Sequence, residues 1–146
     1  MKSIEDYMRL ALKEANKCKS SLDVPVGVVL VKDGVVIAKA HNKKEYSHLV
    51  TAHAELLAID KACKKLGDYR LEGVDVFVTL EPCIMCLGAM LSARVRNVYF
   101  GAYDSRFGVV DTLPHIKFNH SINLVGGVLE NECSKVLSDF FKSIRK

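Results

Sequence analysis

The sequence predicts a single α/β domain in which helices pack against one layered sheet. A hairpin pattern near the N-terminus is followed by alternating helical and β-rich segments, which favours this class. The chain has 146 residues, of which 49% are hydrophobic and 26% charged, as is ordinary for one globular domain. No internal repeat, low-complexity tract or linker interrupts it, so residues 1–146 are expected to form one domain.

The first elements are a helix and a β-hairpin. Ser3 and Asp6 resemble a capping box, and apolar residues then recur at helical spacing to about Lys19. Two β-branched runs, residues 24–31 and 35–40, flank a Lys-Asp-Gly turn. An Asp-Gly step between two such runs predicts a hairpin.

The remaining elements alternate between helix and strand. Thr51 is expected to be the N-cap of a helix that stops at Gly67. Pro82 suits the first turn of another helix, which would run to about residue 93. Three strands and a closing amphipathic helix complete the prediction: residues 74–80, 97–102, 122–127 and 130–146.

Composition limits the compartment and the partners. No apolar stretch approaches the roughly 20 residues needed to cross a bilayer, so no membrane partner is expected. The N-terminal segment is charged throughout, unlike a secretory signal, and five cysteines, an odd number, argue against a disulfide framework. We therefore expect a cytoplasmic protein with reduced thiols. The net charge of +4 permits a polyanionic partner without requiring one.

Two predicted helix starts carry unusual chemistry. The stretch "TAHAE" places His53 and Glu55 at one start, and "EPCIMC" places Cys83 and Cys86 at another. Residues three apart on a helix share a face, so both sulfurs can reach one point. A helix N-terminus also favours thiolate over thiol. Thiolate and imidazole are suitable zinc ligands, so these residues predict a zinc site.

The number of ligands indicates a catalytic metal. His53, Cys83 and Cys86 make three ligands, and catalytic zinc sites keep the fourth position for water. Glu55 is placed to accept a proton from that water and pass it on. The other cysteines occupy apolar or amphipathic positions typical of a core: Cys18, Cys63 and Cys133.

Each half of this pattern has a simpler interpretation when it is taken alone. A histidine at a helix start is usually a cap or a core residue, and a lone Cys-x-x-Cys also suits thioredoxin-like redox chemistry. The combination of H-x-E with P-C-x-x-C favours zinc chemistry over either. A dithiol redox protein and a non-catalytic zinc module that binds RNA remain the rivals from other classes.

The paired motifs, at this spacing, are the signature of the zinc-dependent nucleoside and nucleobase deaminases. The segments "DVPVGVVLV", "TAHAELLAI", "VTLEPCIMCLGAM" and "VYFGAYDSRFG" resemble the bacterial tRNA-specific adenosine deaminases within that superfamily. This resemblance covers nearly the whole chain. It implies a three-layer α/β/α cytidine-deaminase-like fold with a central mixed five-stranded sheet. It also implies hydrolysis of adenosine to inosine at the wobble position of a tRNA anticodon, with one zinc ion per subunit of a homodimer.

The resemblance also assigns roles to residues of this chain. His53, Cys83 and Cys86 would hold zinc, and Glu55 would carry protons. Asn42 would hydrogen-bond the flipped nucleoside. The other implied contacts to substrate or to the anticodon stem-loop are Asp104, Pro25, Val26, Arg106, Lys142 and Arg145.

Two departures from the family pattern bear on how RNA is held. Leu49 and Val50 stand where the family commonly has Asp-Pro, and the segment after Asp104 is shorter and contains Phe107. The residues alone do not separate adenine from cytosine chemistry, because both use the same zinc-assisted attack. A deaminase of free cytosine, guanine or a nucleoside is therefore the nearest alternative.

Overall fold

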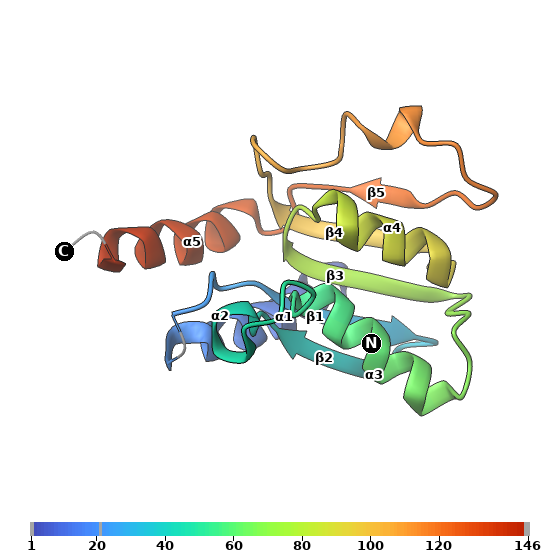
Figure 1. Ribbon diagram of the computed structural model, residues 1–146, viewed down its shortest axis with the longest axis horizontal. Helices are drawn as coiled ribbons and strands as arrows, with labels where there is room; N and C mark the ends of the chain where they lie inside the picture. The colour runs from blue at the N-terminus through green and yellow to red at the C-terminus, as the bar shows by residue number, and fades with distance from the viewer. Residues whose placement is uncertain (1, 21, 145–146) are drawn as a thin grey trace.

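The computed structural model describes residues 2–20 and 22–144, and in these residues five strands form one mixed sheet (Figure 1). The strand order is β2-β1-β3-β4-β5. Strand β1 pairs antiparallel with β2 and β3, whereas β3, β4 and β5 are parallel, so the predicted mixed five-stranded sheet is confirmed. The strands are β1 (Gly27–Lys32), β2 (Val35–His41), β3 (Val74–Leu80), β4 (Asn97–Ala102) and β5 (Asn123–Val125).

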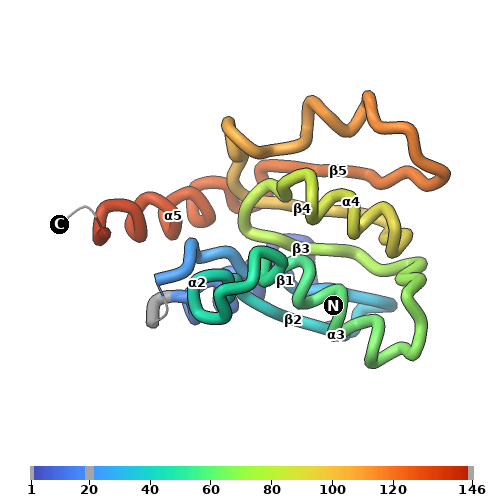
Figure 2. The backbone as a smooth tube through the Cα atoms, viewed as in Figure 1, coloured from blue at the N-terminus to red at the C-terminus, as the bar shows by residue number. Residues whose placement is uncertain are grey.

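Helices cover both faces of the sheet, which confirms the predicted three layers. Helices α3 (Ala54–Leu66) and α4 (Ile84–Ala93) lie in front of the sheet in Figure 1. Helix α1 (Ile4–Asn16) lies behind it, and α5 (Glu130–Ile144) contacts β3, β4 and α1 before extending away from the body (Figure 2). Three short helices were not predicted: η1 (Lys17–Ser20), α2 (Lys44–Ser47) and η2 (Leu113–His115).

The central strands divide their side chains between two cores. In β1, Val28 and Leu30 pack into the core beneath α3 and α4, and Val29 and Val31 pack toward α1. Phe77 of β3 joins the second core, while its neighbours in that strand face the first. Because helices bury both faces, these strands are almost continuously apolar in sequence.

The predicted first helix and hairpin are largely confirmed. Ser3 Oγ accepts a hydrogen bond from the Asp6 backbone at 3.1 Å, and Asp6 Oδ2 accepts one from the Ser3 backbone at 3.0 Å. The α-helix ends at Asn16, earlier than predicted, and continues as η1. The hairpin turns at Asp33 and Gly34, whose φ angles of 51° and 76° suit a tight turn with the twist of the strands.

Two helices begin later than the sequence predicted, and both differences matter for function. Thr51 is not an N-cap, because residues 49–52 form a turn in which the Ala52 N–H donates to the Leu49 carbonyl at 3.1 Å. The N-cap of α3 is His53. Likewise Pro82 lies before α4, whose N-cap is Cys83. The predicted stop of α3 at Gly67 is confirmed by its left-handed φ of 67°.

The topology brings these helix starts to one edge of the sheet. Because β2, β3 and β4 all run in the same direction, their carboxyl ends share that edge, where α3 and α4 begin. This is where α/β sheets commonly bind ligands. Among the described residues, no helix combines the length and the apolar character that crossing a membrane would require.

Candidate active site

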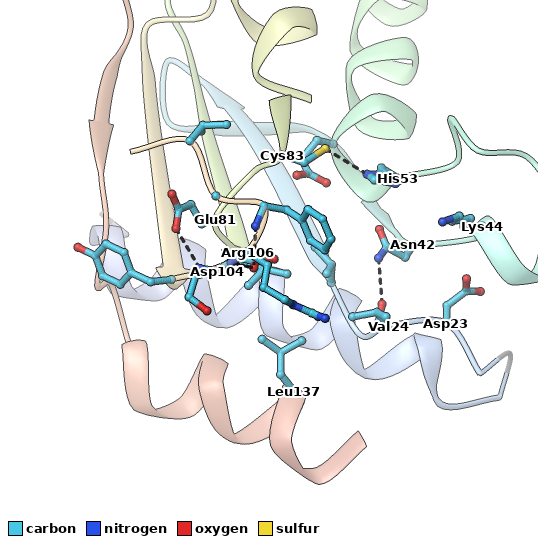
Figure 3. Close-up of a pocket in the computed structure, with 18 of the residues that line it drawn as sticks. Asp23, Val24, Asn42, Lys44, His53, Glu81, Cys83, Asp104, Arg106 and Leu137 are labelled. Carbon is cyan, nitrogen blue, oxygen red and sulfur yellow. Dashed lines mark hydrogen bonds between the residues drawn. The ribbon is translucent and has the colours of Figure 1, made fainter. Parts of the chain in front are cut away.

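Two of the three predicted metal ligands are N-cap residues. His53 precedes α3 with φ −76° and ψ 145°, and Cys83 precedes α4 with φ −83° and ψ 175°, so both have extended backbone. An N-cap side chain commonly accepts a hydrogen bond from its own helix, but neither of these does so. Both side chains are therefore available to point away from their helices toward a common ligand. Figure 3 shows Cys83 and His53 facing each other.

The ligand atoms are spaced for a tetrahedral zinc ion. His53 Nδ1 lies 3.8 Å from Cys83 Sγ and 3.5 Å from Cys86 Sγ, and the two sulfurs are 3.8 Å apart. Zinc–sulfur bonds of about 2.3 Å and zinc–nitrogen bonds of about 2.0 Å at tetrahedral angles require separations of about 3.8 Å between sulfurs and about 3.5 Å from sulfur to nitrogen. The three ligands thus form one face of such a tetrahedron. They are the one cluster of this kind found among the described residues.

Hydrogen bonds inside the cluster set its protonation. Those from the Cys86 thiol and from His53 lower the pKa of Cys83 to about 3. The same contact with Cys83, together with burial, raises the pKa of Cys86. The hydrogen bond with Cys83 also raises the pKa of His53. Negative charge is therefore favoured on Cys83 and disfavoured on Cys86, and a divalent cation bound between them would stabilise the thiolate form of both sulfurs.

Glu55 lies in the first turn of α3, beside the ligand cluster. Its side chain is 4% exposed and lines the adjoining cavity. Burial raises the pKa of Glu55 to about 7, because little water reaches the carboxylate to stabilise its charge. A carboxyl group with a pKa near neutrality can both accept and return a proton.

A cavity of about 870 Å³ opens from this cluster to the surface (Figure 3). His53, Glu55 and Cys83 line its inner part, while Cys86 is buried behind them. The walls come from the segments before β1 and after β2, from the loop after β4 and from α5. The volume is within the range that holds a small organic ligand.

Asn42 lies in the wall between the β2 and α3 segments. Its Nδ2 donates to the Val24 carbonyl at 3.0 Å, and its Oδ1 accepts from the Ala54 N–H at 2.8 Å. The sequence did not predict these two structural bonds. A carboxamide has one further N–H and one further lone pair, so Asn42 can still bind a ligand. Val26 lines the cavity, whereas Pro25 is buried and does not line it. Val24, which was not predicted as a wall residue, also lines the cavity.

The loop after β4, residues 103–110, forms one side of the cavity mouth and is called the rim loop here. Asp104 Oδ1 accepts from the backbone N–H groups of Arg106 at 3.0 Å and Phe107 at 3.1 Å. The Arg106 guanidinium lies over the Phe107 ring, 5.2 Å from its centroid. Asp104 thus shapes the rim loop and holds an exposed cation and an exposed ring at the mouth.

Helix α5 contributes two apolar side chains to the cavity, which the sequence did not predict. Leu137 and Phe141 line it. Lys142 is exposed at the end of the helix and does not line the cavity. The prediction for Arg145 falls outside the described residues. Leu49 and Val50 are exposed beside α3 and do not line the cavity either.

Several cavity residues were not predicted from the sequence. Asp23 is 1% exposed, and its Oδ1 accepts from the Glu45 backbone at 2.6 Å, which fixes α2 beside the cavity. Glu81 is buried below the rim loop. The sequence does not show which backbone groups a buried loop carboxylate will bind. It shows only that Glu81 and Pro82 directly precede Cys83. The other unpredicted lining residues include Lys44, Tyr103, Leu137 and Phe141.

The chain resembles known proteins over most of its length. A family model, the cytidine and deoxycytidylate deaminase zinc-binding region, matches residues 1–102. A tRNA-specific adenosine deaminase from Bacillus subtilis (strain 168) is 50% identical over 146 residues, covering 97% of this chain and 91% of the relative.

Solved structures lead to the same superfamily. A structure from a study of A-to-I editing by tRNA:A34 deaminases at the wobble position matches with a TM-score of 0.86 and 41% identity, covering 90% of this chain and 98% of the other. Guanine deaminase from Bacillus subtilis matches with a TM-score of 0.67 and 30% identity, covering 99% of this chain and 94% of the other.

Proposed function

The chain belongs to the cytidine and deoxycytidylate deaminase zinc-binding family, and from that membership we propose that it is a tRNA adenosine deaminase. The reaction is hydrolysis of adenosine at the wobble position of the anticodon, giving inosine and ammonia. The observation that carries the chemistry is the set of three ligand atoms at tetrahedral spacing beside the buried Glu55. Similarity to named tRNA deaminases carries the choice of substrate.

His53, Cys83 and Cys86 would hold the zinc ion, one per chain. When bound, zinc supplies Lewis-acid chemistry that makes a water molecule reactive at neutral pH. Glu55 accepts the proton that this water loses as its oxygen bonds to C6 of adenine. Glu55 then delivers that proton to N1 of the ring. Glu55 then takes the second proton of the water from the new C6 hydroxyl and passes it to the amine. The C6–N bond breaks, ammonia leaves and C6 becomes a carbonyl, so no co-reactant besides water is needed.

The cavity wall orients the base for this proton transfer. Asn42 is held by the Val24 carbonyl and the Ala54 N–H, so its remaining donor and acceptor have fixed directions. A preorganised amide of this kind positions a nucleoside without a large entropic cost at the moment of reaction. Val26 supplies apolar contact in the same cavity, and Asp104, which also lines it, would lie near the ribose.

The mouth of the cavity fits the proposal that an anticodon stem-loop is bound. Bases of a single-stranded loop can be splayed into a pocket at lower cost than paired bases. Lys44 and Arg106 line the cavity, and Lys142 is exposed at the end of α5. Cations at these positions can contact phosphates, and the exposed Phe107 can stack on a base.

The direct test supplies zinc-loaded protein with an anticodon stem-loop, and separately with free adenosine, cytidine and guanine. Inosine in the stem-loop, with little product from the free compounds, is the expected result. Product from a free base or nucleoside alone would favour a small-molecule deaminase, of which guanine deaminase is the structural relative described above. Binding of RNA without any product would favour a non-catalytic zinc module.

We further propose that the protein acts as a homodimer in the cytoplasm and that residues 1–146 form one deaminase domain. The segment around α2 supports the dimer, because it exposes three apolar side chains beside the start of α3: Tyr46, Leu49 and Val50. Val50 is 67% exposed, so Val50→Asp should not disturb the fold. Light scattering should give twice the chain mass for the wild type and a shift toward monomer for Val50→Asp. A wild-type monomer would contradict the dimer without affecting the chemistry.

A further inference from the structure

Glu81 lies between the metal-ligand turn and the rim loop, at the carboxyl end of β3. We propose that Glu81 is a positioning residue that anchors the rim loop and so sets the geometry in which that loop meets the RNA. This inference rests on the proposed function for its substrate, but not for the anchoring itself.

Both oxygens of the Glu81 carboxylate are bound to the loop. Oε1 accepts from the Asp104 N–H at 2.9 Å, and Oε2 accepts from the Val110 N–H at 2.8 Å. These two amides lie near opposite ends of the rim loop, so one side chain holds both ends. Glu81 is only 6% exposed, and hydrogen bonds to a carboxylate are stronger than those between neutral groups. Figure 3 shows Glu81 directed at Asp104.

The middle of the rim loop packs directly on the same carboxylate. A Cβ atom added to Gly108 would lie 2.2 Å from Cδ of Glu81 and 2.3 Å from each of its oxygens. Any other residue at position 108 would therefore displace either the loop or the Glu81 carboxylate and so break the fit between them. The loop is thus fitted to this side chain along its length, not only at its ends.

The backbone connects this anchor to the metal-ligand turn. The Glu81 N–H donates to the Ala102 carbonyl at 2.8 Å, and Cys83 follows two residues later. One short segment therefore carries a metal ligand and the anchor of the loop that presents Arg106 and Phe107. Because both carboxylate oxygens are directed at loop amides, Glu81 acts on substrate through the loop and not by contact.

The test compares two carboxylates at opposite ends of β3. Glu81→Gln keeps the shape of the side chain but turns an amide NH₂ toward one of the two backbone donors. Asp75→Asn is the matched control, because Asp75 also accepts several hydrogen bonds, from Arg96 at 3.0 Å and from Asn97 at 2.8 Å, far from the cavity. A loss of overall stability alone would speed amide exchange throughout the domain in Glu81→Gln, and not specifically at the rim loop.

Two readouts decide the outcome in zinc-loaded protein. Amide hydrogen exchange at Asp104 and Val110 should become at least about tenfold faster in Glu81→Gln, because an opened hydrogen bond exposes its N–H, and should not change in Asp75→Asn. The kcat/KM for an anticodon stem-loop should fall by about 10- to 100-fold in Glu81→Gln, the effect expected of a misplaced binding loop, with zinc content unchanged. Unchanged exchange or unchanged kcat/KM in Glu81→Gln would overturn the proposal.

Gly108→Ala tests the same contact by changing the loop residue that packs on Glu81. This variant can replace Glu81→Gln if Glu81→Gln does not fold. Its added methyl should displace the loop and lower kcat/KM while zinc stays bound. If both residues act through one contact, the double variant should be no worse than the poorer single variant. Fully additive losses would contradict a shared contact. A wild type that makes no inosine would refute the proposed function, while the exchange measurement would still decide whether Glu81 anchors the loop.

Discussion

The metal-ligand turns and the rim loop lie on the same cavity but are held in different ways. His53 and Cys83 owe their positions to their own backbone, because each is the N-cap of a helix that packs on the sheet. The rim loop has no regular element of its own and is held by Glu81, a side chain more than twenty residues away in sequence. Local backbone structure therefore positions the metal ligands, whereas a side chain distant in sequence positions the loop at the mouth of the cavity.

The largest expected effect comes from removing a buried metal ligand. Cys86→Ala should lose both zinc and deamination, because the remaining two ligands cannot form a stable tetrahedral site. Metal analysis of the purified variant should find far less than one zinc per chain. Cys63→Ala is the control, since Cys63 lies in α3 outside the ligand cluster, and it should keep both zinc and activity. Retention of zinc by Cys86→Ala would show that the ligand set is wrong.

Glu55→Gln should separate the proton carrier from the metal. The amide preserves the size of the side chain but cannot accept a proton, so kcat should fall by about 10²- to 10⁴-fold or more. Zinc content and stem-loop binding should stay close to the wild type. A variant that turned over normally would remove Glu55 from the chemistry and leave the metal centre as a structural site.

The difference between the metal-ligand turns and the rim loop also explains which parts of the fold and of the site the sequence predicts. The strands, the helices and their approximate starts follow from apolar periodicity and from Gly and Pro signals, which are local properties of the sequence. The three-layer arrangement around a mixed five-stranded sheet was expected from the family resemblance. His53 and Cys83 were placed in first turns, two positions inside the helices that they cap, because the turn at residues 49–52 and the extended backbone of Cys83 were not predicted. The shared location of the three ligands was nevertheless predicted.

The rim was predicted less well, because its partners are distant in sequence. Asn42 and Asp104 were expected to bind substrate, and the structure shows that both also bind backbone groups. Glu81 was visible in the sequence only as the residue before Pro82. Nothing local in a sequence indicates that its carboxylate meets the amides of Asp104 and Val110. The sequence also did not indicate that Leu137 and Phe141 of α5 reach the cavity.

Removing a cation from the rim loop should reduce activity less than removing a metal ligand or Glu55. Arg106→Ala should raise KM for the stem-loop by about fivefold and reduce the salt dependence of binding by about one phosphate contact. Zinc content and kcat should not change. Arg70→Ala is a close control, because Arg70 also lies over a neighbouring ring, that of Tyr69 at 5.1 Å, but outside the cavity. Equal effects from the two variants would mean that Arg106 contributes only general positive charge.

The smallest effect is expected near the C-terminal end of α5, which is exposed and lies outside the cavity. Lys142 is exposed and does not line the cavity, so Lys142→Ala should raise KM for the stem-loop only about twofold, as for one screened phosphate contact. Lys135 lies on the same helix but pairs with Asp139 at 2.7 Å, so Lys135→Ala should have less effect. A large loss for Lys142→Ala would mean that the RNA extends along α5, and the mouth of the site would then reach well beyond the rim loop.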